Sequence, residues 1–471
     1  MTGDRSRDGR PRIVVIGGGI TGLAAAHALV RAAPAAHVTL LEAAEALGGK
    51  VRAGPFAGLP SVECGADMFL ARTPAAVDLV TELGLAGELV APAALPALVW
   101  SEGRLHALPE GLVLGAPARL WPLATSGLLS WRGKARAAIE PVLPRRDRGD
   151  SVGAVIRGRF GDQVLERLVG PLIGGINAGD PDRLSLGAVT PQLAEAMTGR
   201  RSLLLGLRAQ ARARPSGQPA SPFLAPRSGV STIVHRLTEA IGAGGGDIQR
   251  ESGVRALAAH AGGGWTVMTE TASLSADAVI LTAPAPAAAG LLRAISPSAS
   301  AALGSIDYAS VAMVTLAVPE ASLTRAVPAS GYLVPRHEQR TITACSWGSA
   351  KWEQWRQPGQ TVLRISAGRD GDEHALDLDD AYLTAAVLAD LERHVGLEGD
   401  PTAVRITRWR QAMPQYRPGH VERVDALIGT MARDAPGLHL AGAAYRGLGL
   451  PACIAQGQAA ARAALATVGQ G

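Results

Sequence analysis

The feature that most constrains the fold is a run of four β-branched residues followed at once by three spaced glycines. Residues 13–16 predict a buried parallel strand, and the glycines predict a tight turn into an alanine-rich helix. Gly17 permits the turn, Gly19 lets phosphates approach the backbone, and Gly22 lets the helix pack closely on the strand. An ordinary glycine-rich turn is the alternative. Because free N–H groups at a helix start favour an anion, the stretch predicts a pyrophosphate site.

A second strand and the residues after it narrow the choice of ligand. Residues 37–41 predict a strand that ends at Glu42, 20 residues beyond Gly22, where a carboxylate accepts hydrogen bonds from an adenosine ribose. A second glycine turn follows at residues 48–49, and a nicotinamide-binding domain has no need of it. Lys50, beside this turn, could be a ligand contact or a solvated surface charge. The arrangement resembles the extended signature of two-domain flavoproteins of the amine oxidase type, in which the second turn lies along the ribitol and pyrophosphate of FAD.

Length and charge limit the class of protein. A chain of 471 residues is too long for one simple core and predicts two or three structural units. Hydrophobic residues make up 47% and charged residues 18%, so a large core can form and global disorder is not expected. The net charge of +5 favours an anionic substrate or an anionic membrane surface. Nucleic acid is not an expected partner, because the arginines are scattered and no basic helix is interleaved with aromatic residues.

The cysteines and the apolar stretches indicate the compartment. Cys64, Cys345 and Cys453 are far apart in the sequence, so neither a disulfide framework nor a metal site is expected, and a reducing cytoplasm is predicted. Residues 1–12 have no apolar core and do not resemble a signal peptide. Residues 111–131 are the longest apolar stretch, but prolines and an arginine interrupt it, so no membrane span is expected. With its neighbouring tryptophans, this stretch could rest on a membrane surface or pack as a helical layer on the protein.

The middle of the chain predicts two further units. Residues 98–200 have the pattern of amphipathic helices separated by Pro and Gly, and Asp150 or Ser151 could cap one of them. The acidic run 370–373 lacks the spacing of a calcium loop and predicts a solvated turn. A helix is expected over residues 381–395. Strand patterns predict a second sheet from residues 308–318, 341–347 and 361–367.

The C-terminal stretch predicts a second site for negative charge. Residues 437–442 predict a strand that ends at Gly442, and a tight loop leads into a helix with Pro451 at its first position. A helix N-terminus stabilises negative charge, and beside a flavin it would do so at the N1–C2 oxygen edge of the reduced ring. A plain terminal helix is the alternative.

Motifs spread over nearly the whole chain carry a family resemblance. The segment 170–185 is the most specific of them, whereas the glycine fingerprint is shared by many flavoproteins. The other matching pieces are residues 17–22, Glu42 with 48–50, 65–72, 343–347 with 351–352, Trp409 with 413–416, and 440–457. On these motifs the chain resembles the oxygen-dependent protoporphyrinogen and coproporphyrinogen III oxidases, which are FAD enzymes of haem biosynthesis in the amine oxidase superfamily.

The resemblance implies an α/β fold with a Rossmann-like FAD-binding domain of the p-hydroxybenzoate hydroxylase type. This domain is expected to be discontinuous, formed by residues 11–97, 220–290 and 402–471. Two insertions are expected: a helical domain at residues 98–200, which could contact a membrane surface, and a sheet-containing substrate-binding domain at residues 291–401.

The family pattern also implies the site residues. Arg72 is the first candidate to hold a substrate propionate, because a guanidinium binds a carboxylate with two hydrogen bonds; a surface role is the alternative. Gly175 could let a backbone carbonyl approach the pyrrole N–H groups, which a side chain would obstruct. Asn177 stands where the family commonly has an aromatic residue, which leaves the packing over the substrate or flavin open. The residues expected to contact FAD are Gly17, Gly18, Gly19, Ile20, Thr21, Gly22, Glu42, Ala43, Gly49, Lys50, Gly65, Ala66, Asp67, Met68, Val254, Trp409, Gly442, Leu448, Gly449 and Leu450.

The implied substrate sets the chemistry. Oxidation of a porphyrinogen at its CH–CH groups removes six electrons and six protons, with flavin N5 accepting a hydride in each of three turns and O2 reoxidising the flavin to give hydrogen peroxide. Coproporphyrinogen III is favoured over protoporphyrinogen IX, because such enzymes typically act on it in Gram-positive bacteria and the Ala, Arg and Gly bias fits a high-GC bacterium. The expected location is the cytoplasm, with contact to the inner face of the membrane and a transient contact with a ferrochelatase as further expectations.

Two rival functions stay open. A flavin amine or carotenoid oxidoreductase would use the same cofactor domain, although Tyr445 alone gives thin support for an aromatic amine cage. A catalytically silent FAD-binding or assembly protein would bind flavin without substrate-dependent reduction.

Overall fold

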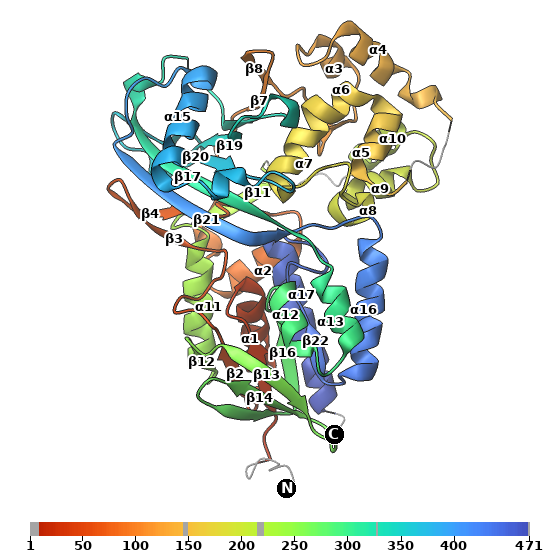
Figure 1. Ribbon diagram of the computed structural model, residues 1–471, viewed down its shortest axis with the longest axis vertical. Helices are drawn as coiled ribbons and strands as arrows, with labels where there is room; N and C mark the ends of the chain where they lie inside the picture. The colour runs from red at the N-terminus through yellow and green to blue at the C-terminus, as the bar shows by residue number, and fades with distance from the viewer. Residues whose placement is uncertain (1–8, 145–148, 214–220, 326–327, 470–471) are drawn as a thin grey trace.

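Two sheets of different kinds organise the fold (Figure 1). The computed structural model describes residues 9–144, 149–213, 221–325 and 328–469. One sheet has five parallel strands and the other has seven mostly antiparallel strands, and a layer of helices lies beside the second. The architecture is therefore mixed α/β, as the sequence predicts.

The β-branched run lies at the centre of the parallel sheet. In sheet order the strands are β12 (Asp247–Gln249), β2 (His37–Leu41), β1 (Arg12–Ile16), β16 (Ala278–Leu281) and β22 (Leu438–Leu440). Successive side chains of a strand point to opposite faces. Ile13 and Val15 accordingly pack into one core cluster, and Val14 and Ile16 into another. All four are buried, which explains why this strand has no polar alternation.

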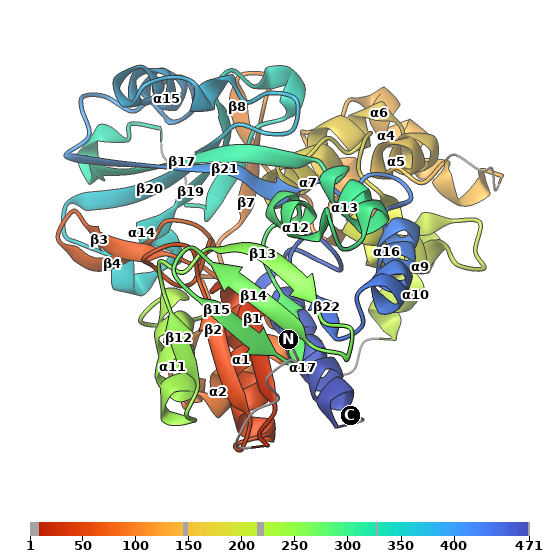
Figure 2. The ribbon, with the colours of Figure 1, turned by 60° about the horizontal axis from the view of Figure 1, so that its bottom comes forward.

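Helices cover one face of this sheet, and a small antiparallel sheet with further helices covers the other (Figure 2). The first face packs against α1 (Ile20–Ala32), α2 (Pro74–Glu82), α11 (Ser231–Ala243) and α17 (Leu450–Val468). The second is covered by β13 (Val254–Ala259), β14 (Trp265–Thr269), β15 (Ser273–Ala276), α12 (Ala285–Leu292), α13 (Pro297–Gly304) and α16 (His420–Asp434). Since α1 follows β1 and α17 follows β22, both helices start at the carboxyl ends of parallel strands, where α/β proteins place their ligands.

The second sheet contains all three strands that the sequence predicts for it, and the predicted helix packs against it. In sheet order its strands are β21 (Ala403–Pro414), β17 (Tyr308–Pro319), β20 (Gln360–Ala367), β19 (Ile342–Trp347), β18 (Gly331–Leu333), β7 (Ala97–Ser101) and β8 (Arg104–Ala107). The predicted helix is α15 (Asp380–Val395), which covers one face of the sheet. The other face is turned toward the parallel-sheet unit (Figure 1).

Three strands of this sheet lie outside the residue range expected for it. β7 and β8 fall within residues 98–200, where the sequence predicts helices. They form a hairpin because Glu102 and Gly103 adopt φ angles of 52° and 82°, as a two-residue turn requires. β21 falls within residues 402–471, expected in the nucleotide-binding part, but it pairs with β17 over most of its length. The pairings of β7 with β18 and of β21 with β17 join distant segments, which local patterns do not indicate.

The helical layer begins only after these strands. Its helices are α3 (Trp121–Thr125), α4 (Trp131–Ala138), α5 (Val152–Phe160), α6 (Asp162–Val164), α7 (Gly170–Asn177), α8 (Leu186–Val189), α9 (Pro191–Met197) and α10 (Leu203–Arg212). The Ser151 hydroxyl accepts a hydrogen bond from the Ala154 amide at 3.1 Å, so Ser151 is confirmed as a helix cap. Asp150 instead accepts a hydrogen bond from Ser185. Among the described residues, no helix is both long enough and apolar enough to cross a membrane.

Short elements link these units. They are β3 (Ala53–Phe56), β4 (Leu59–Glu63), β5 (Phe69–Leu70), β6 (Leu89–Val90), β9 (Leu112–Val113), β10 (Ala116–Pro117), β11 (Phe223–Pro226) and α14 (Gly348–Lys351). β5, β11 and β6 form a three-stranded sheet, and α14 follows β19 directly.

Candidate active site

The first glycine turn forms an open cradle at the start of α1. Gly17 has a φ of 107°, and its amide donates to the Leu41 carbonyl at 2.8 Å. A Cβ at Gly22 would collide with the Gly17 carbonyl oxygen, so only glycine lets the helix pack this closely. A Cβ at Gly19, in contrast, would meet nothing within 4 Å. No side chain caps α1, so its first amides are available to an anion in this open space.

The second glycine turn lies directly against the first. The Gly48 amide donates to the Gly18 carbonyl at 2.8 Å, and the Cα of Gly19 lies 3.4 Å from where a Cβ of Gly49 would be. Lys50 follows, and its ammonium donates to the Ala412 carbonyl at 2.5 Å. Burial lowers the pKa of Lys50. Lys50 is an exposed residue whose ammonium nonetheless links the glycine turns to β21.

Glu42 occupies the position expected of a ribose-binding carboxylate. Its two oxygens accept hydrogen bonds from the Gly18 amide at 2.6 Å and the Ala44 amide at 2.8 Å. Ala43 lies close to Gly253. Val254, the next residue, is the first residue of β13. The carboxylate thus lies between the first glycine turn and the chain that leaves β2.

The loop at residues 65–68 is held by cations from the second sheet. Arg364 donates to the Gly65 carbonyl. Asp67 accepts hydrogen bonds from Lys351 Nζ at 2.8 Å and from the Trp352 indole at 2.9 Å. Burial alone would raise the pKa of Asp67, but Lys351 and Arg364 lower it to about 2. Asp67 is therefore ionised, and its Oδ2 receives all of these contacts, which hold the loop in position.

Trp409 joins the same loop to β21. Its indole donates to the Cys64 carbonyl at 3.0 Å. Arg405, on the same side of the strand, donates to the Val62 carbonyl at 2.8 Å. Because side chains alternate along a strand, these residues face the parallel-sheet unit, while Val404 and Ile406 face α15.

The C-terminal loop and helix close the cradle from the other side. Gly442 has a φ of 140°. The Tyr416 hydroxyl donates to the Ala443 carbonyl at 2.5 Å and accepts from the Gly447 amide at 3.0 Å, which fixes the loop. Gly449 is the N-cap residue of α17, and no side chain caps this helix. A second uncapped helix N-terminus therefore lies where the sequence predicts an anion-stabilising site.

α7 brings Gly174 and Gly175 against β18 and β19 of the second sheet. Gly175 is exposed, and a Cβ there would lie 3.0 Å from the Leu333 side chain. Asn177 is buried, and its amide donates to the Ile173 carbonyl of its own helix at 3.3 Å. The main-chain carbonyl of Asn177 accepts a hydrogen bond from the Gln415 side-chain amide at 2.9 Å. Asn177 thus holds the end of α7, and Gly175 is an exposed residue close to Leu333.

The structure also locates Arg72 and the acidic run. Arg72 is exposed and lies two residues after the short strand β5. The acidic run 370–373 is not a solvated turn, because Asp370 is buried and both of its oxygens accept hydrogen bonds from Arg417, at 2.8 and 2.9 Å. The partner arginine is 47 residues away, which is why the sequence pattern missed it.

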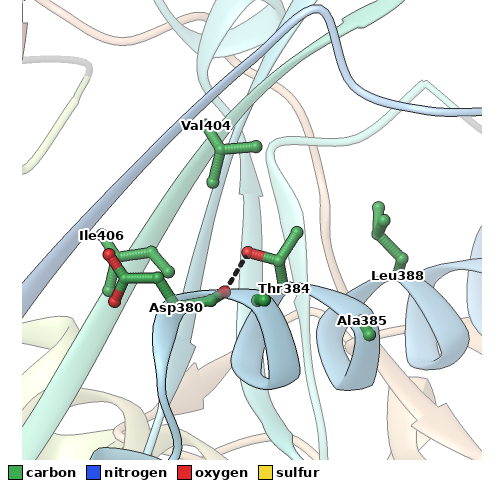
Figure 3. Close-up of a pocket in the computed structure, with 7 residues that line it drawn as sticks. Asp380, Thr384, Ala385, Leu388, Val404 and Ile406 are labelled. Carbon is green, nitrogen blue, oxygen red and sulfur yellow. Dashed lines mark hydrogen bonds between the residues drawn. The ribbon is translucent and has the colours of Figure 1, made fainter.

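A shallow groove of about 500 Å³ lies away from this site, between α15 and β21 (Figure 3). Thr384 donates to the Asp380 carbonyl at 2.6 Å, and the Asp380 side chain pairs with Arg408. The groove is on the α15 face of the sheet, opposite Trp409. Its polar groups are thus already partnered, and we assign it no chemistry.

Sequence reasoning found the glycines and missed most of the cations. Arg364 lies between two apolar residues of the largely buried strand β20, and a lone charge in such a place is a signal that it is paired inside the protein. Lys351 and Trp352 belonged to the recognised motifs without an assigned role. Among the described residues, no group of three or more His, Cys, Asp or Glu could hold a metal ion.

Comparison with known proteins identifies the family. Residues 20–465 match the family described as "Flavin containing amine oxidoreductase". The chain belongs to this family. The cofactor is FAD, and the residues fit it: two uncapped helix starts, an open Gly19 and a carboxylate at Glu42 surround one cradle.

Relatives within this family are similar over nearly their whole length. A coproporphyrinogen III oxidase of Bacillus subtilis is 37% identical, covering 97% of this chain and 98% of the relative. A protoporphyrinogen oxidase of Bos taurus is 30% identical, covering 97% and 98%. The crystal structure of a putative protoporphyrinogen oxidase from Exiguobacterium is 33% identical with a TM-score of 0.85, covering 98% and 99%.

Proposed function

We propose that this flavin oxidoreductase is a coproporphyrinogen III oxidase of haem biosynthesis. It would convert coproporphyrinogen III and three O2 into coproporphyrin III and three H2O2. The single observation that carries this proposal is the 37% identity to an enzyme of that name across almost all of both chains. When bound, FAD supplies the hydride acceptor and the route of electrons to O2.

The protein groups supply orientation and charge. The N-termini of α1 and α17 provide amides for negative charge at the two ends of the cradle. The cations around Asp67 hold the 65–68 loop against the second sheet. In the proposal, Gly175 admits the macrocycle to α7, Arg72 binds a propionate, and Asn177 holds the end of α7.

The finer fold assignment is part of the same proposal. A Rossmann-like FAD-binding domain would comprise residues 11–97, 220–290 and 402–471, with a helical domain at 98–200 and a substrate domain at 291–401. β7, β8 and β21 are exceptions to these ranges, because they pair into the sheet of the substrate domain. The parallel order of β1, β2, β16 and β22 supports the first assignment.

Protoporphyrinogen IX is the second candidate substrate, because a protoporphyrinogen oxidase is among the relatives. Amines are a weaker candidate. Tyr445 is buried in the core cluster around Val14 and Ile16, so it does not form the wall of an open amine cage.

Anaerobic stopped-flow mixing with each porphyrinogen tests the proposal. Bleaching of the visible flavin band, followed by porphyrin fluorescence and peroxide once O2 is admitted, is expected, and the faster substrate decides between the two. A flavin that stays oxidised with both would overturn the assignment and favour a silent FAD-binding protein.

Two contacts complete the proposal. Trp121 and Trp131 are 77% and 73% exposed on neighbouring helices, which supports contact with a membrane surface. A transient contact with a ferrochelatase would pass the porphyrin on. Co-sedimentation with anionic vesicles, compared between the wild type and Trp121→Ala, tests the first contact.

A further inference from the structure

Arg369 is a buried arginine whose guanidinium has no partner among the residues that the structure describes. It is 5% exposed, and Nε is buried without a hydrogen bond. No hydrogen bond or ion pair joins the guanidinium to any residue within the described ranges. Burial lowers the pKa of Arg369 to about 10, with Arg336 adding to the effect, so the group is charged at neutral pH. A buried charge without a partner is costly, which points to an anion supplied by a ligand.

The carboxylates nearest to Arg369 in the chain are committed to other groups. Asp370 accepts from Arg417 at 2.8 and 2.9 Å and from Arg183 at 3.0 Å. Asp372 accepts from Gln339 at 3.2 Å and contacts His374 at 2.9 Å. These acids offset part of the local positive charge but bond elsewhere. Arg369 is thus held in place by a turn whose own ion pairs are complete.

Asp180 is the remaining acid close to this arginine. Its carboxylate accepts from the Asp182 amide at 3.0 Å and lies 3.8 Å from Arg336. It therefore also leaves the Arg369 guanidinium without a hydrogen bond.

The guanidinium lies beside the glycines of α7. Nη1 is 3.9 Å from where a Cβ of Gly174 would be, and Gly175 next to it is exposed. The Asp370 amide donates to the Ala178 carbonyl at 2.7 Å, which ties the turn to the end of α7. Because Gly174 has no side chain, it places no atom beyond its backbone between α7 and the guanidinium.

We propose that Arg369 binds a carboxylate of the substrate beside α7. The proposal rests on the proposed function, in which the substrate carries propionates, and it adds a clamp that the sequence did not indicate. The planar guanidinium would hold one carboxylate with two parallel N–H···O bonds, and Gly174 would let that carboxylate approach. The macrocycle would then lie against α7 at Gly175, with the bound propionate fixing its rotation.

Equilibrium binding of the product tests the clamp without requiring turnover. FAD-loaded protein is titrated with coproporphyrin III and, in the same detergent, with its tetramethyl ester, which has no carboxylates. Arg369→Met is expected to raise the Kd for the tetra-acid by about 10- to 100-fold, the loss of one charge-assisted pair, and to leave the Kd for the ester within about threefold. Arg183→Met, which removes the same charge from a half-exposed neighbour, should change both by less than about threefold.

The alternative is a purely structural arginine. Removing an unpaired buried charge should leave the melting temperature of the ligand-free protein unchanged or raise it, whereas removing a structural partner should lower it. The proposal would be overturned if the ratio of the Kd values for the ester and the tetra-acid were the same in the wild type and Arg369→Met. It would also be overturned if Arg369→Met and Arg369→Gln both lowered the melting temperature. The stopped-flow reaction of the wild type separately decides the proposed function. If the wild type did not oxidise porphyrinogens but still bound the tetra-acid through Arg369, only the proposed activity would be rejected.

Discussion

The ammonium nitrogen of Lys351 lies 2.8 Å from a carboxylate oxygen of Asp67, in an ion pair whose two side chains are each only 10% exposed. Arg364 lies 3.2 Å from the same oxygen. Lys351 is the last residue of α14, and Arg364 lies in β20 of the seven-stranded sheet. Asp67 lies in the loop that follows β4. One carboxylate therefore fixes how that loop sits against the second sheet.

Removing this charge should destabilise the protein. In Asp67→Asn two buried cations lose their partner, so we expect the free energy of unfolding to fall by about 3 kcal/mol and FAD to be retained less tightly. Urea unfolding of the FAD-loaded protein measures the first effect and flavin release the second. Asp425→Asn, at the exposed pair with Arg446, is the matched control and should cost less than 1 kcal/mol.

The same pair should set part of the acid sensitivity. The pKa of Asp67 is about 2 in the folded protein, below its unfolded value near 4, so its contribution is present above about pH 4 and is lost as the pH falls toward 2. The wild type should lose about 2 kcal/mol over this range through this group. Equal pH slopes for the wild type and Asp67→Asn would contradict the assignment.

Glu63 should act in the opposite direction. Burial raises the pKa of its carboxyl to about 7, although the Ser231 amide donates to one oxygen at 3.1 Å; the other oxygen has no partner among the described residues. Stability is therefore full below about pH 4 and is lost as the pH rises through 7, by up to about 3 kcal/mol. Glu63→Gln should be more stable than the wild type at pH 8 and similar at pH 4. Unfolding midpoints at the two pH values measure this, and an unchanged difference between them would refute it.

Local patterns predicted what local physics determines. The glycine turn at Gly17, the cap at Ser151 and the strand and helix of the C-terminal stretch depend on residues within a few positions, and the structure has them. The pairing of β7 with β18 and the pairing of β21 with β17 depend on which distant strands meet. The prediction of a solvated turn at residues 370–373 was wrong for the same reason, because Arg417 pairs with Asp370 only after the chain has folded.

A side chain at Gly175 should obstruct the substrate and spare the cofactor. Its Cβ position is already 3.0 Å from Leu333, so the larger side chain of Gly175→Leu must displace Leu333 or project from the exposed side of α7. We expect kcat/KM for the porphyrinogen to fall at least about 100-fold while the FAD content stays at the wild-type level. Gly187→Leu, in α8 with nothing within 4 Å of its Cβ, is the control. Normal turnover of an FAD-replete Gly175→Leu would remove this glycine from the site.

The contact between α1 and α17 should link stability to FAD binding. A Cβ at Gly457 of α17 would collide with the backbone carbonyl oxygen of Thr21, in the first turn of α1. Because backbone cannot move aside as a flexible side chain does, Gly457→Ala must push the two helices apart, at a cost of about 2 kcal/mol. Gly242→Ala, on an exposed and uncrowded position of α11, should instead stabilise by about 0.5 to 1 kcal/mol, since the substitution improves helix propensity. Displacing Thr21 also disturbs the amides of the pyrophosphate cradle, so the Kd for FAD should rise for Gly457→Ala alone. If both alanine variants gained stability and kept the same affinity for FAD, the close approach of α1 and α17 would have no role in forming the cradle.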